Sequence, residues 1–387
     1  MNDPSTTDIA AQAASATSRE LWVVSRVFPP DDGGVQTYAR SVALAYLRMG
    51  WTVRVFTKTS IGPRRVIEDG LHIVDVGHAS KNVVYLRLAR ELRKALKQAR
   101  REGREPVHLH ACTWRSGIVP MLLRIAPMTV TVHGREIGRP QGLGAGLMRR
   151  VLHASTRIVG VSNWTLDHLL QRMPELRPRS VVAWNGLSGF SATTVSGARN
   201  HHDPLVLSAC RLVPRKNLRL AVAAAADCMK RGLRFRYYLA GRGPEMAALQ
   251  ADVDALGLGD RIRLLGYVSD EELAQLYADA SVFMHPQIEL EDGAEMEGFG
   301  IAIADAMAFG LPCIAGVAGG PSELVDHGHT GLLVDGRDCG AIADALHELL
   351  QDPERADRMG MAARRWTQEH LSWEQHGRLA IPLAPPL

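Results

Sequence analysis

Short apolar runs alternate with amphipathic segments along most of the chain. The runs are three to five residues long and rich in Val, Ile and Leu, which is typical of strands buried on both faces. The segments between them repeat apolar residues every three or four positions, as amphipathic helices do. This alternation predicts the α/β class, with mostly parallel sheets covered by helices on both faces. The runs lie at 21–24, 53–56, 73–76, 107–110, 129–132, 158–161, 181–183, 205–209, 236–240 and 262–265.

The length of 387 residues exceeds that of one ordinary α/β core, so we expect two domains. Residues 1–18 hold two Asp and no basic residue, and they lack the apolar run of a signal peptide, so we expect a disordered tail. A stretch rich in Ser, Thr, Gly and Asn predicts a linker at 191–203. The first domain then spans 19–190, the second spans 204–365, and a helical segment follows at 366–387.

Composition narrows the class of protein only slightly. Apolar residues make up 46% of the chain, as in globular domains, and no run approaches the roughly 20 apolar residues of a membrane span. The five cysteines are odd in number and share no spacing of metal ligands. We therefore expect buried free thiols in a reducing cytoplasm.

The net charge of +4 hides a difference between the two halves. Residues 1–200 hold 28 Lys and Arg against 14 Asp and Glu, whereas residues 201–387 hold 17 against 27. A basic first half favours an anionic acceptor, a membrane surface or nucleic acid. The lack of interleaved aromatic residues argues against nucleic acid.

Segment 87–104 concentrates this charge, with eight basic and two acidic residues. An apolar stripe of Leu86, Leu88, Leu92 and Leu96 would let it lie on an anionic membrane. Alternatively, the leucines pack on the sheet and the basic residues lie in water. Both interpretations stay open, and with them a peripheral position on the inner face of the membrane.

A glycine loop follows the first predicted strand. Gly33 and Gly34 close the sequence Phe-Pro-Pro-Asp-Asp-Gly-Gly and precede a helical pattern. Such a loop lies at the carboxyl end of its strand, where α/β folds bind ligands. It lacks the G-x-G-x-x-G pattern, so a Rossmann dehydrogenase is poorly supported.

The most informative stretch is 289–315, which predicts an acidic loop, a glycine turn, a short apolar helix and a strand. Gly298 and Gly300 let a ligand approach the backbone, and the helix that starts at Ile301 presents free N–H groups to a phosphate. Glu297 and Asp305 are eight residues apart, close to two helical turns. They can thus reach opposite ends of a ligand whose diphosphate lies on the helix N-terminus, as in a nucleotide sugar.

Other candidates lie on loops after strands. Arg211 and Lys216 can neutralise a diphosphate leaving group. His133, followed by Gly134, points into the expected crevice between the domains, where a neutral imidazole can hydrogen-bond a sugar. The Asp-Val-Asp at 252–254 lies in a helical pattern where the two acids diverge, so we expect a solvated surface and no metal site.

Together these motifs resemble the donor site of retaining GT-B glycosyltransferases of family 4, also called glycosyl transferases group 1, over nearly the whole chain. The resemblance rests on two acidic residues separated by seven residues, with G-F-G after the first and A-x-A-x-G-x-P after the second. One departure is Asp305, where the family usually has Glu. The resemblance implies two Rossmann-like domains that face each other across a cleft, with the terminal helix crossing back to the first.

The resemblance also implies residue roles. His133, Glu297, Arg211 and Lys216 would be catalytic, with Glu297 on the sugar hydroxyls and Asp305 on the ribose. Loop 266–268 would contact the nucleobase. The donor-binding residues would be Gly33, Gly34, Arg211, Lys216, Gly266, Tyr267, Val268, Glu297, Gly298, Phe299, Gly300, Ile301 and Asp305.

We therefore expect a cytoplasmic, retaining, metal-independent hexosyltransferase without a cofactor. Its donor would be a UDP-sugar or GDP-mannose, and its acceptor a hydroxyl of a glycan, a lipid-linked molecule or a small molecule. Two alternatives use the same scaffold. An epimerase or hydrolase would turn over the donor without an acceptor, and a decayed regulator would bind the nucleotide and release nothing.

Overall fold

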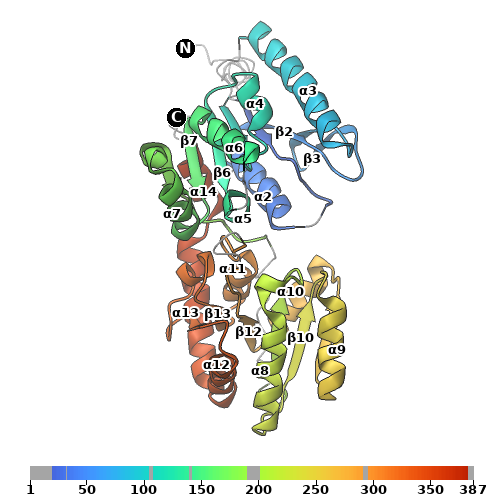
Figure 1. The fold of residues 1–387 in the computed structure, drawn as a ribbon, viewed down its shortest axis with the longest axis vertical. Helices are drawn as coiled ribbons and strands as arrows, with labels where there is room; N and C mark the ends of the chain where they lie inside the picture. The colour runs from blue at the N-terminus through green and yellow to red at the C-terminus, as the bar shows by residue number, and fades with distance from the viewer. Residues whose placement is uncertain are drawn as a thin grey trace, which may run out of the picture.

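The chain folds into two α/β bodies stacked along its long axis (Figure 1). The computed structural model describes residues 20–31, 33–103, 108–138, 142–189, 201–290 and 295–381. The tail expected at 1–18 lies outside these residues, as does most of the linker expected at 191–203. The prediction of an α/β fold with mostly parallel sheets is confirmed.

The first body is built on an eight-stranded sheet with the order β3-β4-β2-β1-β5-β6-β7-β8. All neighbours are parallel except β3, which runs antiparallel to β4 at the edge. The sequence Arg-Arg-Val-Ile-Glu of β3 has no apolar run, so the pattern did not reveal it. The strands are β1 Glu20–Val24, β2 Thr52–Thr57, β3 Arg64–Glu68, β4 Leu71–Asp75, β5 His108–Ala111, β6 Met128–Val132, β7 Arg157–Gly160 and β8 Ser180–Val182.

Helices cover both faces of this sheet because successive strand residues point to opposite sides. Leu21 and Val23 pack toward α2, and Trp22 and Val24 pack toward α3. The helices of this body are α2 Gly34–Arg48, α3 Lys81–Arg101, α4 Ile118–Leu122, α5 Arg135–Gly138, α6 Leu143–Ala154 and α7 Asn163–Arg172, with a 3-10 turn, η1, at Pro174–Arg179.

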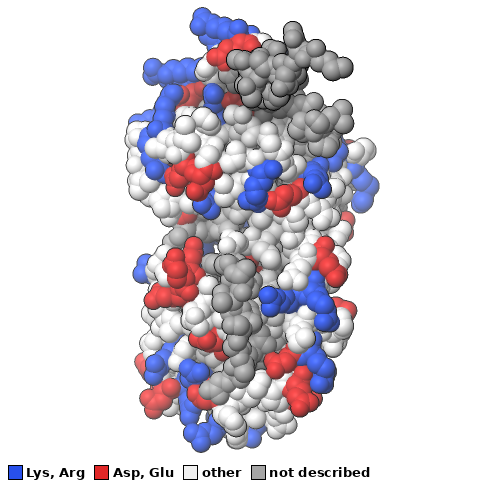
Figure 2. Space-filling model, turned by 180° about the vertical axis from the view of Figure 1, so that it is seen from behind, with Lys and Arg blue, Asp and Glu red and all other residues white. Residues whose placement is uncertain are grey.

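The basic helix α3 differs in one respect from its predicted stripe. It buries Leu88 and Leu92 together with Val84, Ala95 and Ala99, whereas Leu86 is 71% exposed. Leu86 therefore faces solvent. Lys and Arg side chains gather along one edge of the first body (Figure 2). The other leucines of the stripe pack on the sheet, as the second interpretation requires.

The second body contains a six-stranded sheet, entirely parallel, with the order β11-β10-β9-β12-β13-β14. Its strands are β9 Leu205–Ala209, β10 Arg236–Ala240, β11 Ile262–Gly266, β12 Val282–His285, β13 Cys313–Gly316 and β14 Gly331–Val334. Its helices are α8 Leu218–Lys230, α9 Met246–Leu256, α10 Asp270–Asp279, α11 Ile301–Ala308, α12 Cys339–Gln351 and α13 Pro353–His370, with 3-10 turns η3 Pro214–Lys216 and η4 Gly320–Glu323.

The last helix, α14 (Trp373–Ala380), packs on α2 of the first body although it follows α13 of the second (Figure 1). The Trp373 indole donates to the carbonyl of Leu187 at 2.6 Å, and the Arg48 guanidinium lies 2.5 Å from Glu374. Trp373 belongs to an apolar core that continues from one body into the other. Two chain segments, the one around Leu187 and the one before α14, therefore join the bodies side by side.

A buried polar network anchors α14. The Tyr38 hydroxyl lies 2.7 Å from Nε2 of His376 and 2.8 Å from Oγ1 of Thr131. Nδ1 of His376 lies 3.1 Å from the carbonyl of Trp184. Burial lowers the pKa of His376 to about 4. The ring is therefore neutral in the folded protein at neutral pH.

We predict that this network makes the protein sensitive to acid. Between the unfolded pKa of about 6.5 and the folded value, the unfolded chain binds a proton on His376 that the folded chain excludes. Stability present above this window is lost as pH falls through it, at about 1.4 kcal/mol per pH unit for each such histidine. His376→Gln should reduce the slope of the unfolding free energy against pH by the contribution of one bound proton, about 1.4 kcal/mol per pH unit. Denaturant titrations at pH 7, 6 and 5 measure this slope. An unchanged slope would contradict this.

Candidate functional site

A cleft of about 610 Å³ separates the two bodies at the carboxyl ends of their strands. This is the edge where parallel α/β sheets bind ligands. Its walls come from loops after β1, β2, β5, β6 and β8 on one side, and from the loop after β9 and the start of α11 on the other. The lining includes Arg26, Gly33, Gly34, Lys58, Thr113, Arg115, His133, Arg135, Glu136, Asn185, Arg211, Arg215, Met296, Glu297, Gly298, Phe299, Gly300 and Ile301.

The glycine turn before α11 has the geometry its sequence predicts. Gly300 has a φ of 90°, a left-handed conformation that favours glycine, and it forms the N-cap of α11. Gly298 is required for a different reason, because a Cβ there would overlap the backbone carbonyl oxygen of His133. The two walls of the cleft thus meet at backbone contact.

Hydrogen bonds hold this contact. The hydroxyls of Ser162 and Thr165 donate to the carbonyl of Gly298 at 2.7 and 3.1 Å. Glu323, in η4, accepts from the backbone N–H groups of Asn163 at 2.9 Å and Trp164 at 2.6 Å. These donors lie at the start of α7, where free N–H groups favour a carboxylate. The first turn of α7 is therefore bound at two points to the second body.

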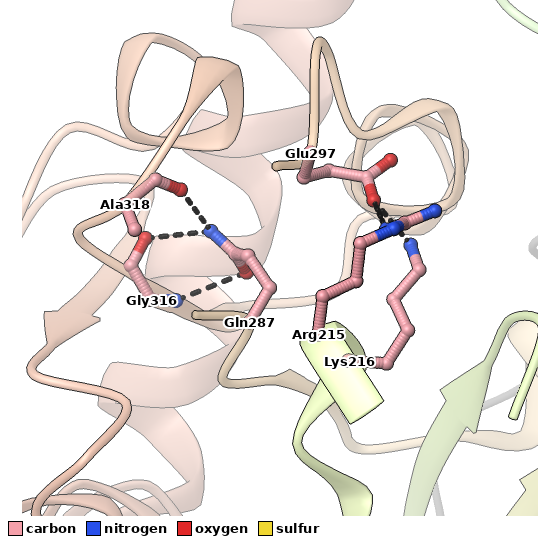
Figure 3. A network of polar contacts seen from close by, with 6 residues as sticks. All are labelled: Arg215, Lys216, Gln287, Glu297, Gly316 and Ala318. Atoms are coloured by element: carbon pink, nitrogen blue, oxygen red, sulfur yellow. Dashed lines mark hydrogen bonds and ion pairs between the residues drawn. The ribbon is translucent and has the colours of Figure 1, made fainter. Parts of the chain in front are cut away.

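Glu297 is the carboxylate at the centre of the second wall (Figure 3). Lys216 Nζ lies 2.6 Å from its Oε2, and the Arg215 guanidinium also contacts that oxygen. Burial alone would raise the pKa of Glu297, but the charges of Lys216 and Arg215 outweigh it and hold the pKa well below its usual range. Glu297 is therefore ionised at physiological pH.

Arg215 is a site residue that the sequence did not single out. The sequence pattern selected Arg211 as the arginine that neutralises a diphosphate. Arg211 lines the cleft, but its side chain is exposed. Arg215 lies in the 3-10 turn η3, and its side chain is only 16% exposed beside Glu297. The sequence Pro-Arg-Lys-Asn shows that two cations are present in this loop. A loop has no periodicity, however, so the sequence does not show which of them faces Glu297.

Gln287 fixes the backbone of the loops next to Glu297 (Figure 3). Its amide donates to the carbonyls of Gly316 at 2.7 Å and Ala318 at 3.0 Å, and its oxygen accepts from the Gly316 N–H at 3.1 Å. The loops after β12 and β13 are thereby fixed to each other. His285 lies deeper, and burial holds its pKa well below the ordinary value, so it adds no positive charge at neutral pH.

His133 lies on the first wall, as predicted. Its Nε2 is 2.7 Å from the carbonyl of Cys112, and a carbonyl only accepts, so Nε2 carries the proton. Its backbone N–H donates to Glu136 Oε1 at 2.6 Å, and its ring packs edge-on against Tyr38 with centroids 4.6 Å apart. In the neutral ring, Nδ1 is left as a hydrogen-bond acceptor.

The structure gathers most of the predicted site residues around the cleft. His133, Glu297, Arg211, both glycines of the first loop and the whole turn 298–301 line it. Lys216 is not among the residues that line the cleft, but its Nζ contacts Glu297, which does line it. Asp305 and loop 266–268 do not line this cavity.

Asp305 and the loop after β11 have other surroundings. Asp305 is buried and accepts a hydrogen bond from the Ser188 backbone N–H at 2.9 Å, and burial raises its pKa to about 6. Tyr267 is 56% exposed, with the Arg242 guanidinium 5.0 Å from its ring centroid. Asp305 thus contacts the segment that joins the bodies.

The described residues contain no group of three His, Cys, Asp or Glu side chains that could hold a metal ion. The Asp-Val-Asp at 252–254 lies in α9, where Asp252 forms an ion pair with Arg219 at 2.5 Å. Within the described ranges, no helix has the length and apolarity to span a bilayer.

Two α/β domains with parallel sheets that face a shared cleft define the GT-B class of glycosyltransferases. Solved structures agree: sucrose-phosphate synthase from Thermosynechococcus elongatus is 22% identical with a TM-score of 0.74, over 93% of this chain and 96% of that one. HepE from Anabaena, in complex with UDP and glucose, is 16% identical with a TM-score of 0.70, over 93% and 97%.

The family follows from the sequence comparisons. Residues 32–188 match the model of Glycosyltransferase Family 4, and residues 192–366 match that of Glycosyl transferases group 1. The GDP-mannose-dependent alpha-(1-6)-phosphatidylinositol monomannoside mannosyltransferase of Mycolicibacterium smegmatis is 27% identical over 93% of this chain and 97% of its own. The chain belongs to this family of glycosyltransferases, which transfer sugar from nucleotide sugars.

The Gly298 contact generates a prediction about domain closure. Gly298→Ala places a methyl group on the His133 carbonyl, and because both partners are backbone the cleft must open to relieve it. We expect donor turnover to fall at least about tenfold, with overpacking on the order of 1–3 kcal/mol. Gly146→Ala is the matched control, since a Cβ there meets nothing within 4 Å. Wild-type turnover in Gly298→Ala would show that the contact is dispensable.

Proposed function

We propose that this protein is a retaining hexosyltransferase that takes mannose from GDP-mannose, or a hexose from a UDP-sugar, and passes it to a hydroxyl of a glycan, lipid-linked or small-molecule acceptor. The observation that carries the proposal is the ionised Glu297 held by Arg215 and Lys216 beside the N-terminus of α11. The M. smegmatis relative, which uses GDP-mannose, supports the donor.

Charge stabilisation is the proposed source of catalysis. Cleavage of the bond between the sugar and the diphosphate develops negative charge on the phosphate and positive charge on the ring. Arg211, Lys216 and the free N–H groups at Ile301 would stabilise the phosphate. Glu297 would hold sugar hydroxyls, and His133 Nδ1 would accept a hydrogen bond from another. With these cations in place, the reaction needs no metal ion or cofactor.

The nucleoside would bind further along α11. In this proposal the Asp305 carboxylate holds the ribose, and the backbone of loop 266–268 contacts the base. Gly33 and Gly34 approach the phosphates from the first domain. Retention follows a same-face path in which the leaving phosphate assists deprotonation of the acceptor. The enzyme would act in the cytoplasm, with α3 available for peripheral contact with the inner membrane surface.

Thermal-shift measurements with GDP-mannose, UDP-glucose and ADP-glucose test the donor, because a ligand that binds only the folded state raises Tm. We expect GDP-mannose to give the largest shift, unchanged by EDTA. Donor turnover without any acceptor would instead identify an epimerase or hydrolase. Nucleotide binding without turnover under any condition would identify a regulator.

Glu297→Gln tests the central carboxylate. The amide keeps the shape but loses the charge that meets the sugar, so we expect a loss of transfer rate worth ~2–4 kcal/mol with the fold retained. Glu271→Gln, on the exposed start of α10, makes the same chemical change away from the cleft. Transfer rates at saturating donor, with Tm as the check on folding, decide the role. Equal rates in wild type and Glu297→Gln would remove Glu297 from catalysis.

A further inference from the structure

The wall of the cleft that belongs to the first domain carries a group of cations that are not part of the proposed donor site. Lys58 follows β2, Arg26 follows β1 and Arg115 follows β5, and all three line the cleft. These strands are neighbours in the order β2-β1-β5. Their carboxyl ends therefore bring the three side chains to one place on the wall opposite α11.

Aromatic rings, and not carboxylates, position the two arginines. The Arg26 guanidinium lies over the ring of Tyr85 at 5.3 Å, and that of Arg115 lies over the ring of Trp114 at 4.5 Å. A cation–π contact of this kind holds a guanidinium over the ring without using its N–H donors. Within the described part of the chain, neither arginine has an ion-pair partner, and Nε of Arg26 is buried without a hydrogen bond.

The loops that carry these residues are tied to their neighbours. The Arg26 backbone N–H donates to Oγ of Ser116 at 3.2 Å, and Oγ of Ser116 lies 2.9 Å from Oγ1 of Thr113. Ser60, two residues after Lys58, donates from its backbone N–H to Asp31 at 3.1 Å. The cations are therefore held on ordered loops.

The cations of this group repel one another. Arg26, Arg115 and Lys58 are all only partly exposed. Burial lowers the pKa of Arg115, and the nearby Arg26 lowers it further, while Glu136 acts in the opposite direction. Glu136 is already engaged by the His133 backbone N–H. Partly buried like charges cost free energy that a bound anion would recover.

We propose that Arg26, Arg115 and Lys58 form a binding site for an anionic group, of the phosphate class, on the acceptor. This inference deepens the proposed function and rests on it. The donor diphosphate is met on the opposite wall by Arg211, Lys216 and the start of α11, so a second set of cations serves a second anion. The acceptor hydroxyl then enters the cleft between this group and Glu297. The source of the phosphate is either a lipid headgroup or a soluble or glycan-borne phosphate ester.

The test compares two sugars that differ only in a phosphate. With the nucleotide pocket saturated by GDP, mannose 6-phosphate and mannose are titrated into wild type by calorimetry. We expect the phosphate ester to bind at least about tenfold more tightly. Arg26→Gln and Arg115→Gln should each weaken its binding about tenfold or more, and Lys58→Gln provides a third variant if either arginine variant fails to fold. Arg93→Gln, on the exposed face of α3, is the control because it removes the same charge away from the cleft.

The outcomes separate this inference from the proposed function. Equal affinity for the two sugars, or unchanged binding by the variants, would overturn the anion site. A parallel loss of GDP-mannose affinity would also overturn it, because the arginines would then serve the donor. Failure of wild type to bind any nucleotide sugar would instead contradict the proposed function.

Vesicles identify the source of the phosphate. Phosphatidylcholine vesicles with and without phosphatidylglycerol are sedimented with wild type and with each variant. A lipid headgroup is supported if wild type binds selectively to the anionic vesicles and the Arg26 and Arg115 variants lose this binding. Equal vesicle binding by wild type and variants, together with discrimination of the two sugars, supports a soluble or glycan-borne phosphate.

Discussion

The close approach of the Gly298 backbone to the carbonyl of His133 is the constraint on which the rest of the site depends. It brings the start of α11, with Glu297, against the strand end that carries His133. Ser162 and Thr165 hold the same peptide from the first domain. Because every partner in this contact is backbone or a short hydroxyl side chain, the geometry tolerates little adjustment. The cleft therefore has one well-defined width where sugar and acceptor would meet.

The electrostatics of the cleft follow from this closed geometry. Arg215, Lys216 and Glu297 are mostly withdrawn from solvent, and burying an ion pair contributes little net stability in general. Such a group is better explained by function, since strongly perturbed carboxylates in clefts are characteristic of active sites. A diphosphate placed at α11 would compete with Glu297 for Lys216. Donor binding would thereby release the carboxylate toward the sugar.

Local sequence was sufficient for much of the fold and for naming most of the candidate residues that line the cleft. The glycine turn at 298–300 and the strand-loop-helix units are local features, so their pattern predicts them. The partners of Glu297 come from more than 80 positions away, and which cation of the loop faces it depends on the turn η3. Strand β3 is an edge strand with charged residues and little apolar signal. The hydrogen bond from Ser188 to Asp305 depends on how the domains dock, which no local pattern encodes.

The path of the chain between the domains limits how the cleft can open. Helix α14 continues from the second domain but is bonded to the first through Tyr38 and His376. Undocking it would leave these buried polar groups without partners, which costs more free energy than a bend in a loop. Trp373 contacts Gly186 so closely that a Cβ on Gly186 would overlap the indole, so the two crossing segments move together. Opening must therefore bend near 186–188 and 371–372. Because Ser188 donates to Asp305 within the first of these segments, such a bend would also change the surroundings of the second acidic residue.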